Sequence, residues 1–233
     1  MRSISGRKRT HRLLVSVVVG LAVLAASAQA ALPLKPLSSL GKLKAAPSGG
    51  PTGPEAVPIP NAKVLASVLS PKLNQTIDGV TCQRVEKVAF HIHAHLTIFA
   101  DGKALQIPYG IGIGPPLKGV NTTAGPFVTE GSCFMWLHTH TSDGIIHEES
   151  PVQRSFTLGQ FFAVWGIKLS RTQVGPRKGK VTTFYDDKVW TGDPNAVPLT
   201  SEAQIQLDVG TPLIAPEHIN FPKALAATTA TKK

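Results

Sequence analysis

The chain has few charged and few aromatic residues for its length. Of its 233 residues, 16% are charged, 6% are aromatic and 42% are hydrophobic. The low charge excludes a disordered chain and favours one globular domain with a sizeable core. Internal repeats are absent, and no aromatic residues interleave with the lysines as they do on a nucleic-acid platform. We therefore expect a single domain that does not bind nucleic acid.

The N-terminus lacks acidic residues, a twin-arginine motif and a cysteine for lipid attachment. Five basic residues precede an apolar run that ends in the small-residue pattern Ala28-Gln29-Ala30. This order is typical of a secretory signal peptide, and we predict cleavage after Ala30. The alternative is an uncleaved membrane anchor, for which the apolar run is nearly long enough.

Removal of residues 1–30 takes away five basic and no acidic residues, so the formal net charge falls from +10 to +5. Much of the basicity therefore belongs to the targeting signal. We expect a secreted or extracytoplasmic protein with no stable membrane insertion once the signal is removed. The sequence does not indicate a protein partner.

Two other segments lack a core pattern. Residues 31–60 are rich in proline, glycine and small residues, which predicts a linker or flexible arm. Residues 223–233 have no apolar periodicity and predict a flexible tail. A single β-rich domain is therefore expected over residues 61–222.

Alternating apolar and polar residues indicate strands in this domain. Residues 87–100 alternate and predict one strand, and residues 101–113 follow it directly. The dipeptide Asp101-Gly102 between the two favours a tight turn, so we predict a hairpin here. A second hairpin is predicted between residues 133–140 and 145–149, with the turn at 141–144. Further strands are expected at 180–186 and 202–209.

One segment has helical spacing instead. Within residues 155–166, Thr157 is a possible helix N-cap and Gly166 is a common C-terminal stop. The apolar residues between them recur at helical spacing: Leu158, Phe161, Phe162 and Trp165. We predict a mainly β fold, an antiparallel sandwich or barrel-like domain, with this one short helix packed on the sheet.

Cys82 and Cys133 are the only cysteines. In an exported protein such a pair is more often a disulfide than two free thiols or metal thiolates, and we predict the bond. Closing a loop of about 50 residues stabilises a fold by roughly 3 to 4 kcal/mol in the chain-entropy model. The alternative is that both thiols are reduced and buried.

Six of the eight histidines lie in two short blocks, one after each cysteine. The blocks contribute His91, His93 and His95, and His138, His140 and His147; His11 and His218 are the others. Residues two apart on a strand share a face, so the first three imidazoles point away from the apolar stripe of their strand. Imidazole is the commonest metal-binding side chain near neutral pH, so we predict that the two blocks form a metal site.

The first block is too long for one ion. Three alternate residues of a strand span about 13 Å from first to last, so either one of these histidines does not bind the metal or there are two sites. An all-histidine site, with Glu148 or Glu149 as an additional ligand, suits Cu(II) or Zn(II), with Mn or Fe as further candidates. Disulfide-bonded cysteine cannot ligate, and Met135 is expected opposite His138, which disfavours a Cys-Met electron-transfer copper site.

Four blocks in residues 80–170 occur together: "HIHAHLTI", "PYGIGI", "LHTHTSDGIIHEESP" and "FTLGQFFAVWG". In this combination the chain resembles an uncharacterised group of exported bacterial and archaeal proteins that share these blocks in this order. The resemblance implies that the histidines and the predicted helix belong to one unit. It implies no reaction, so function has to be argued from the site.

Three functions are compatible with these patterns. The first is a secreted protein that binds copper or zinc outside the cytoplasm, which the absence of an obvious nucleophile favours. The second is a metal-dependent enzyme with a histidine-ligated ion and Glu148 or Glu149 as general base. The third is a structural or adhesive envelope module in which the histidines only form hydrogen bonds.

Overall fold

The computed structural model of the protein describes residues 31–225 and 228–229. The predicted signal peptide, residues 1–30, lies outside these residues. Within the described part of the chain, no helix is long and apolar enough to cross a membrane. The described residues from Pro33 onward form one compact unit.

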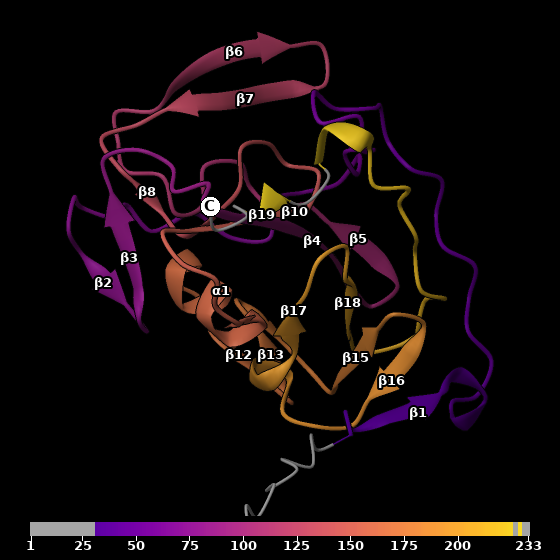
Figure 1. Cartoon of the computed structure of the whole chain (residues 1–233). Helices are drawn as coiled ribbons and strands as arrows, with labels where there is room; N and C mark the ends of the chain where they lie inside the picture. The colour runs from indigo at the N-terminus through magenta and orange to yellow at the C-terminus, as the bar shows by residue number, and fades with distance from the viewer. Residues whose placement is uncertain (1–30, 226–227, 230–233) are drawn as a thin grey trace, which may run out of the picture. The chain divides into compact units, whose positions relative to one another are not determined.

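The largest sheet of this unit has nine strands and is open at both ends (Figure 1). Along its main path the strands run β1 (Leu34–Pro36), β16 (Lys188–Trp190), β15 (Val181–Tyr185), β18 (Gln204–Val209), β4 (Phe90–Ala100), β10 (Ile145–Ser150) and β9 (Leu137–His138). The strands β5 (Lys103–Leu105) and β19 (Thr228–Thr229) also pair with β4. All pairs are antiparallel except β18 with β4, which is parallel. The predicted mainly β fold is confirmed, as an open sheet and not a closed barrel.

Smaller sheets surround this one. They comprise β2 (Thr76–Ile77), β3 (Val80–Gln83) and β8 (Phe134–Met135); β6 (Lys118–Thr122) and β7 (Gly125–Glu130); β11 (Phe156–Thr157) and β17 (Pro198–Leu199); and β12 (Leu169–Ser170), β13 (Gln173–Val174) and β14 (Arg177–Lys178). Three short 3-10 helices are η1 (Leu37–Ser39), η2 (Pro194–Ala196) and η3 (Lys223–Leu225). Figure 1 shows the β6–β7 hairpin apart from the single α-helix.

Both predicted hairpins are present. β4 turns into β5 at Asp101 and Gly102, whose φ angles of 51° and 71° are the positive values that a tight two-residue hairpin turn requires. β9 turns back into β10 so that His138 lies opposite His147. The strands predicted at 180–186 and 202–209 are β15 and β18.

The predicted helix is α1 (Leu158–Trp165). Thr157 caps its N-terminus by accepting a hydrogen bond from the backbone N–H of Gln160, whose side chain in turn accepts from the backbone N–H of Thr157. Gly166 ends the helix with a φ of 83°, in the left-handed region that glycine adopts without strain. The helix buries its apolar residues in the main core.

The two faces of β4 have different surroundings. Its alternate apolar residues, from Phe90 to Ile98, join the main core with the buried face of α1. His91, His93 and His95 project from the other face, as the alternation predicts. That second face is also covered, since His93 is only 1% exposed.

Segments that were expected to be flexible cover the histidine face. Residues Glu55, Val57 and Ile59 are buried in alternation, and Val57 packs with Ile145 and with Leu225 of η3 in a second, smaller apolar cluster. β1 and β19 also pair with the large sheet. Residues 55–59 of the expected arm and Leu225 of the expected tail thus pack onto the domain, while the boundaries at residues 60 and 222 stay predictions. Local composition gave no sign of this packing because its apolar partners are distant in the sequence.

The predicted disulfide between Cys82 and Cys133 is present, with a Cα–Cα distance of 5.5 Å. It ties β3 to the residue before β8 and closes a loop of 51 residues. The alternative of two reduced thiols is thereby excluded.

Replacing both cysteines by alanine is expected to lower the free energy of unfolding by roughly 3 to 4 kcal/mol, because the unfolded chain regains the entropy of the open loop. Urea denaturation of the double variant and the wild type measures the difference. Wild-type protein unfolded under reducing conditions should match the variant. Equal midpoints for variant and oxidised wild type would contradict the prediction.

Candidate metal centre

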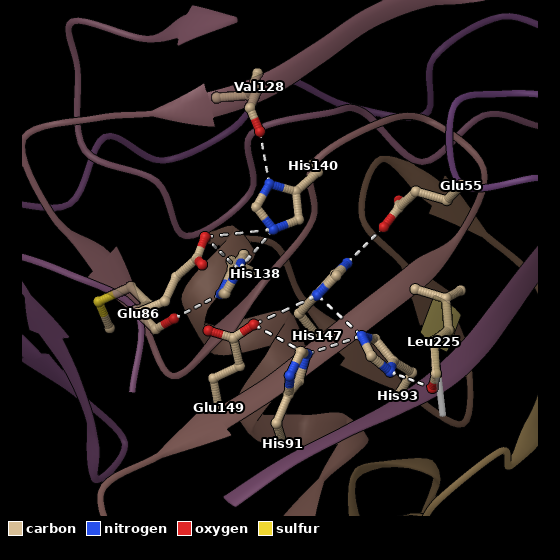
Figure 2. A network of polar contacts seen from close by, with 11 residues as sticks. Glu55, Glu86, His91, His93, Val128, His138, His140, His147, Glu149 and Leu225 are labelled. Carbon is tan, nitrogen blue, oxygen red and sulfur yellow. Dashed lines mark hydrogen bonds and ion pairs between the residues drawn. The ribbon is translucent and has the colours of Figure 1, made fainter. Parts of the chain in front are cut away.

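Five of the six histidines predicted as ligands point toward one another on the covered face of the sheet (Figure 2). In chain order they are His91 and His93 of β4, His138 of β9, His140 just beyond it and His147 of β10. Strand pairing places His147 directly opposite His93 on one neighbour and opposite His138 on the other. Side chains at such positions have Cβ atoms about 4.5–5.5 Å apart. Three imidazoles therefore stand in a row across three adjacent strands.

The sixth histidine, His95, lies apart from this cluster. Its Nε2–H donates to the backbone carbonyl of Asp143 at 3.0 Å. Its side chain lines a different cavity of about 440 Å³, between the large sheet and the loops around Pro47 and Pro216. The three histidines of β4 thus do not reach one ion, as their spacing predicts.

Three imidazoles of the cluster are fixed by backbone carbonyls. A carbonyl oxygen only accepts hydrogen bonds, so the ring nitrogen beside it must carry the proton, and the other nitrogen of the neutral ring then has a free lone pair. In each case Nδ1 is the donor and Nε2 faces the cluster: His93 donates to Leu225 at 2.9 Å, His138 to Met135 at 2.9 Å and His140 to Val128 at 2.6 Å.

This pattern brings two lone pairs together. Nε2 of His138 lies 3.1 Å from Nε2 of His140, yet both protons are on the opposite nitrogens. With no proton between them the two atoms repel each other, whereas a cation between them would accept both lone pairs. Two nitrogens bound to tetrahedral zinc at 2.0–2.1 Å are about 3.3 Å apart, close to the observed separation.

His147 is held by a carboxylate. Its Nε2 lies 2.7 Å from Oε1 of Glu55, so Nδ1 is directed into the cluster. When Glu55 is ionised, Nε2–H donates to this carboxylate and Nδ1 keeps its lone pair. That Nδ1 is 3.1 Å from Nε2 of His93 and 3.6 Å from Oε1 of Glu149. A carboxylate on the outer nitrogen of an imidazole fixes the ring and raises its basicity as a metal ligand.

The two neighbouring glutamates of β10 lie on opposite faces. Glu149 shares the face of His147, and its Oε1 is 3.1 Å from Nε2 of His91. Glu148 points the other way, since it pairs with Ile92 of the core face and is completely buried. Only Glu149 therefore reaches the cluster. The alternation of strand side chains carries this distinction in the sequence itself.

Two further carboxylates at the cluster were missed by the sequence analysis. Glu55 contacts His147, and Oε1 of Glu86 lies 3.6 Å from Nε2 of His140 and 3.9 Å from that of His138. Glu55 is the only acidic residue of the 31–60 segment and alternates with two apolar residues, which was an available signal. Glu86 lies in the loop before β4, and nothing in its sequence context distinguishes it.

Burial controls the charge of the cluster. Removal from water lowers the pKa of His93 to about 2, with a further contribution from the nearby His147, and lowers the pKa of His140 and of His147 to about 4. It lowers the pKa of His138 well below the ordinary value. These rings are neutral near pH 7 and keep their lone pairs.

Burial shifts the pKa values of the carboxyl groups at the cluster in the opposite direction. Burial raises the pKa of Glu55 to about 7, and it also raises the pKa of Glu149 and of Glu86. The second oxygen of Glu149 is buried and has no hydrogen-bonding partner among the described residues. A bound cation would stabilise both the ionised carboxylates and the inward lone pairs.

Two groups of side chains at the cluster are close enough to hold a metal ion. One comprises His138, His140, His147 and Glu149, and the other comprises His91, His93 and His147. Within each group the ligand atoms lie within 4.8 Å of one another. Imidazole nitrogen and carboxylate oxygen are donors that divalent transition metals accept, so the residues fit such an ion.

The chain matches no protein-family model, no curated protein and no solved structure. What the fold and the site define is a class: a disulfide-bonded, mainly β domain with a buried histidine and glutamate cluster able to hold a divalent metal ion.

Proposed function

We propose that this protein binds a divalent transition metal, copper or zinc, outside the cytoplasm through the histidine cluster. The observation that carries the proposal is the pair of inward lone pairs on His138 and His140, 3.1 Å apart with no proton between them. A hydrogen-bonded structural cluster would place one proton in each such contact. A metal ion explains why both outer nitrogens are protonated.

The donor set supports copper or zinc. Both cysteines form the disulfide and Met135 packs into the main core, so the nearby donors are imidazole nitrogen and carboxylate oxygen. Imidazole suits Cu(II) and Zn(II), while manganese prefers sites richer in oxygen. The disulfide supports a location outside the reducing cytoplasm, in agreement with the signal peptide predicted for residues 1–30.

A metal-dependent enzyme is the second candidate, because one carboxylate stands beside the ligands. Glu149 would be its general base, since Glu148 lies on the opposite face of β10. Turnover also needs an open coordination position that substrate can reach. The ligands are largely enclosed, with side-chain exposure of 0% for His138 and 7% for His147, which favours holding an ion over turnover. A spectroscopic signature of exchangeable water on bound Cu(II) would favour the enzyme.

The metal content of protein purified without an affinity tag tests the proposal. We expect dialysed wild-type protein to retain copper or zinc in elemental analysis. The variant His140→Ala should bind the metal at least about tenfold more weakly, because it loses one inward lone pair.

His218→Ala is the matched control, since His218 is half exposed, forms an ion pair with Asp187 and belongs to neither group of ligands. It should retain the wild-type metal affinity. Wild-type protein that takes up neither copper nor zinc from solution would overturn the proposal and support the structural or adhesive module.

A further inference from the structure

The cluster offers two overlapping groups of ligands, and they share His147. The outer nitrogen of His147 is engaged by Glu55, so Nδ1 alone faces the cluster. One lone pair binds one ion. If both groups bind metal, one of them must be completed without His147.

A first position is surrounded by four donor atoms. They are Nε2 of His91, Nε2 of His93, Nδ1 of His147 and Oε1 of Glu149. Taken in this order around the ring, successive atoms are separated by 3.0 Å, 3.1 Å, 3.6 Å and 3.1 Å. The three imidazole nitrogens all lie within 4.8 Å of one another, and Oε1 of Glu149 stands beside two of them, those of His91 and His147. This position therefore uses the lone pair of His147.

A second position lies on the other side of Glu149. Nε2 of His138 and Nε2 of His140 are 3.1 Å apart, and Oε1 of Glu86 approaches both at 3.9 Å and 3.6 Å. Glu149 belongs to the group of ligands around these two histidines, and its Oε2 is buried without a partner among the described residues. Two imidazoles and two carboxylates thus complete this position without His147.

We propose that the cluster binds two metal ions and that Glu149 bridges them, with Oε1 on the first ion and Oε2 on the second. This inference rests on the proposed metal-binding function and adds the number of ions and the bridging residue. A bridging carboxylate explains why one oxygen of Glu149 contacts the His91 side while its other oxygen has no protein partner. Ions in two-metal sites lie about 3.5–4 Å apart, a distance that one carboxylate spans.

The number of ions per chain tests the proposal. All proteins carry His218→Gln, so that the histidine outside the two sequence blocks and the predicted signal peptide does not contribute. After equilibrium dialysis against Zn(II), we expect elemental analysis to give two ions per chain. The variants His138→Ala/His140→Ala and His91→Ala/His93→Ala should each retain one.

His95→Gln is the control for a buried histidine of β4, because His95 faces the other cavity. It should retain two ions. One ion per chain in the otherwise wild-type protein would overturn the two-ion site and leave metal binding intact, whereas no ion would overturn the metal-binding function itself. These outcomes do not depend on whether the double variants fold.

Copper tests the bridge directly. Two Cu(II) ions joined by one carboxylate couple magnetically, so the resonance of isolated Cu(II) should appear with one equivalent and weaken with the second. In Glu149→Gln the exchange coupling through the carboxylate should be lost, and the second equivalent should bind more weakly. Two uncoupled Cu(II) signals in the otherwise wild-type protein would exclude the bridge.

Discussion

The variant Glu148→Gln is expected to gain stability relative to the wild type as the pH rises. Between about pH 4 and about pH 9, the difference in free energy of unfolding between variant and wild type should grow by roughly 5 kcal/mol. Glu148 is completely buried on the core face of β10, and neither of its carboxyl oxygens has a hydrogen-bonding partner among the described residues. Burial alone raises its pKa from 4.5 to about 8. The folded protein therefore holds the carboxyl neutral.

The direction of the effect follows from proton uptake. Between about pH 4.5 and pH 8 the folded protein binds a proton at Glu148 that the unfolded chain has released, so each unit of rising pH disfavours folding by roughly 1.4 kcal/mol. Above the folded pKa both states are ionised and the loss stops growing. Glutamine is neutral throughout and removes this dependence.

Urea denaturation of both proteins in the presence of a chelator, at several pH values, measures the effect without bound metal. The replacement Glu202→Gln is the control, because Glu202 is exposed to solvent. It should leave the pH dependence of stability unchanged. A constant difference between Glu148→Gln and the wild type from about pH 4 to pH 9 would show that Glu148 is not held neutral in the fold.

The faces of the central strand could be predicted from the sequence. Alternation over residues 90–98 identifies both the apolar core face and the shared face of His91, His93 and His95, because the side-chain period of a strand is two. The turn dipeptide Asp101-Gly102 predicted β5 as one antiparallel partner of β4. Its partner on the other side, β18, could not be predicted, since a parallel pair has no local turn that joins its strands.

The sequence also did not predict which segments cover the histidine face. Val57 and Leu225 come from segments without a long apolar pattern, and they are buried in a cluster with Ile145 of β10. Without that cover the histidines would be in water, where their lone pairs would be solvated. The enclosure is therefore what turns a set of same-face histidines into a site with neutral rings and directed lone pairs.

Some outer contacts of the ligands depend on the same packing. The carbonyl of Leu225 fixes His93, and Glu55 fixes His147, so the arm and the tail orient ligands from β4 and β10. These contacts join residues far apart in the sequence. A pattern of local residues predicts which side chains can bind a metal, whereas their tautomers depend on the assembled fold.

Removing the metal is expected to lower the thermal unfolding midpoint of the wild type by roughly 8 to 16 °C. A ligand that binds only the folded state at about 1,000 times its dissociation constant stabilises it by roughly 4 kcal/mol. For a chain of this size each kcal/mol shifts the midpoint by about 2 to 4 °C. Calorimetry with added Zn(II) and after its chelation measures the difference.

The zinc-dependent shift of the unfolding midpoint, measured in variants, identifies which residues account for the stabilisation. His218→Ala should keep the full response, because His218 pairs with Asp187 at the surface and belongs to neither group of ligands. His140→Ala should lose much of it, since the paired lone pair on His138 then has no second imidazole to share an ion. If two ions bind, His138→Ala/His140→Ala should retain about half of the response, because the position formed by His91, His93 and His147 still stabilises the folded state. A wild-type midpoint that is indifferent to zinc, to copper and to their chelation would contradict the proposed metal site.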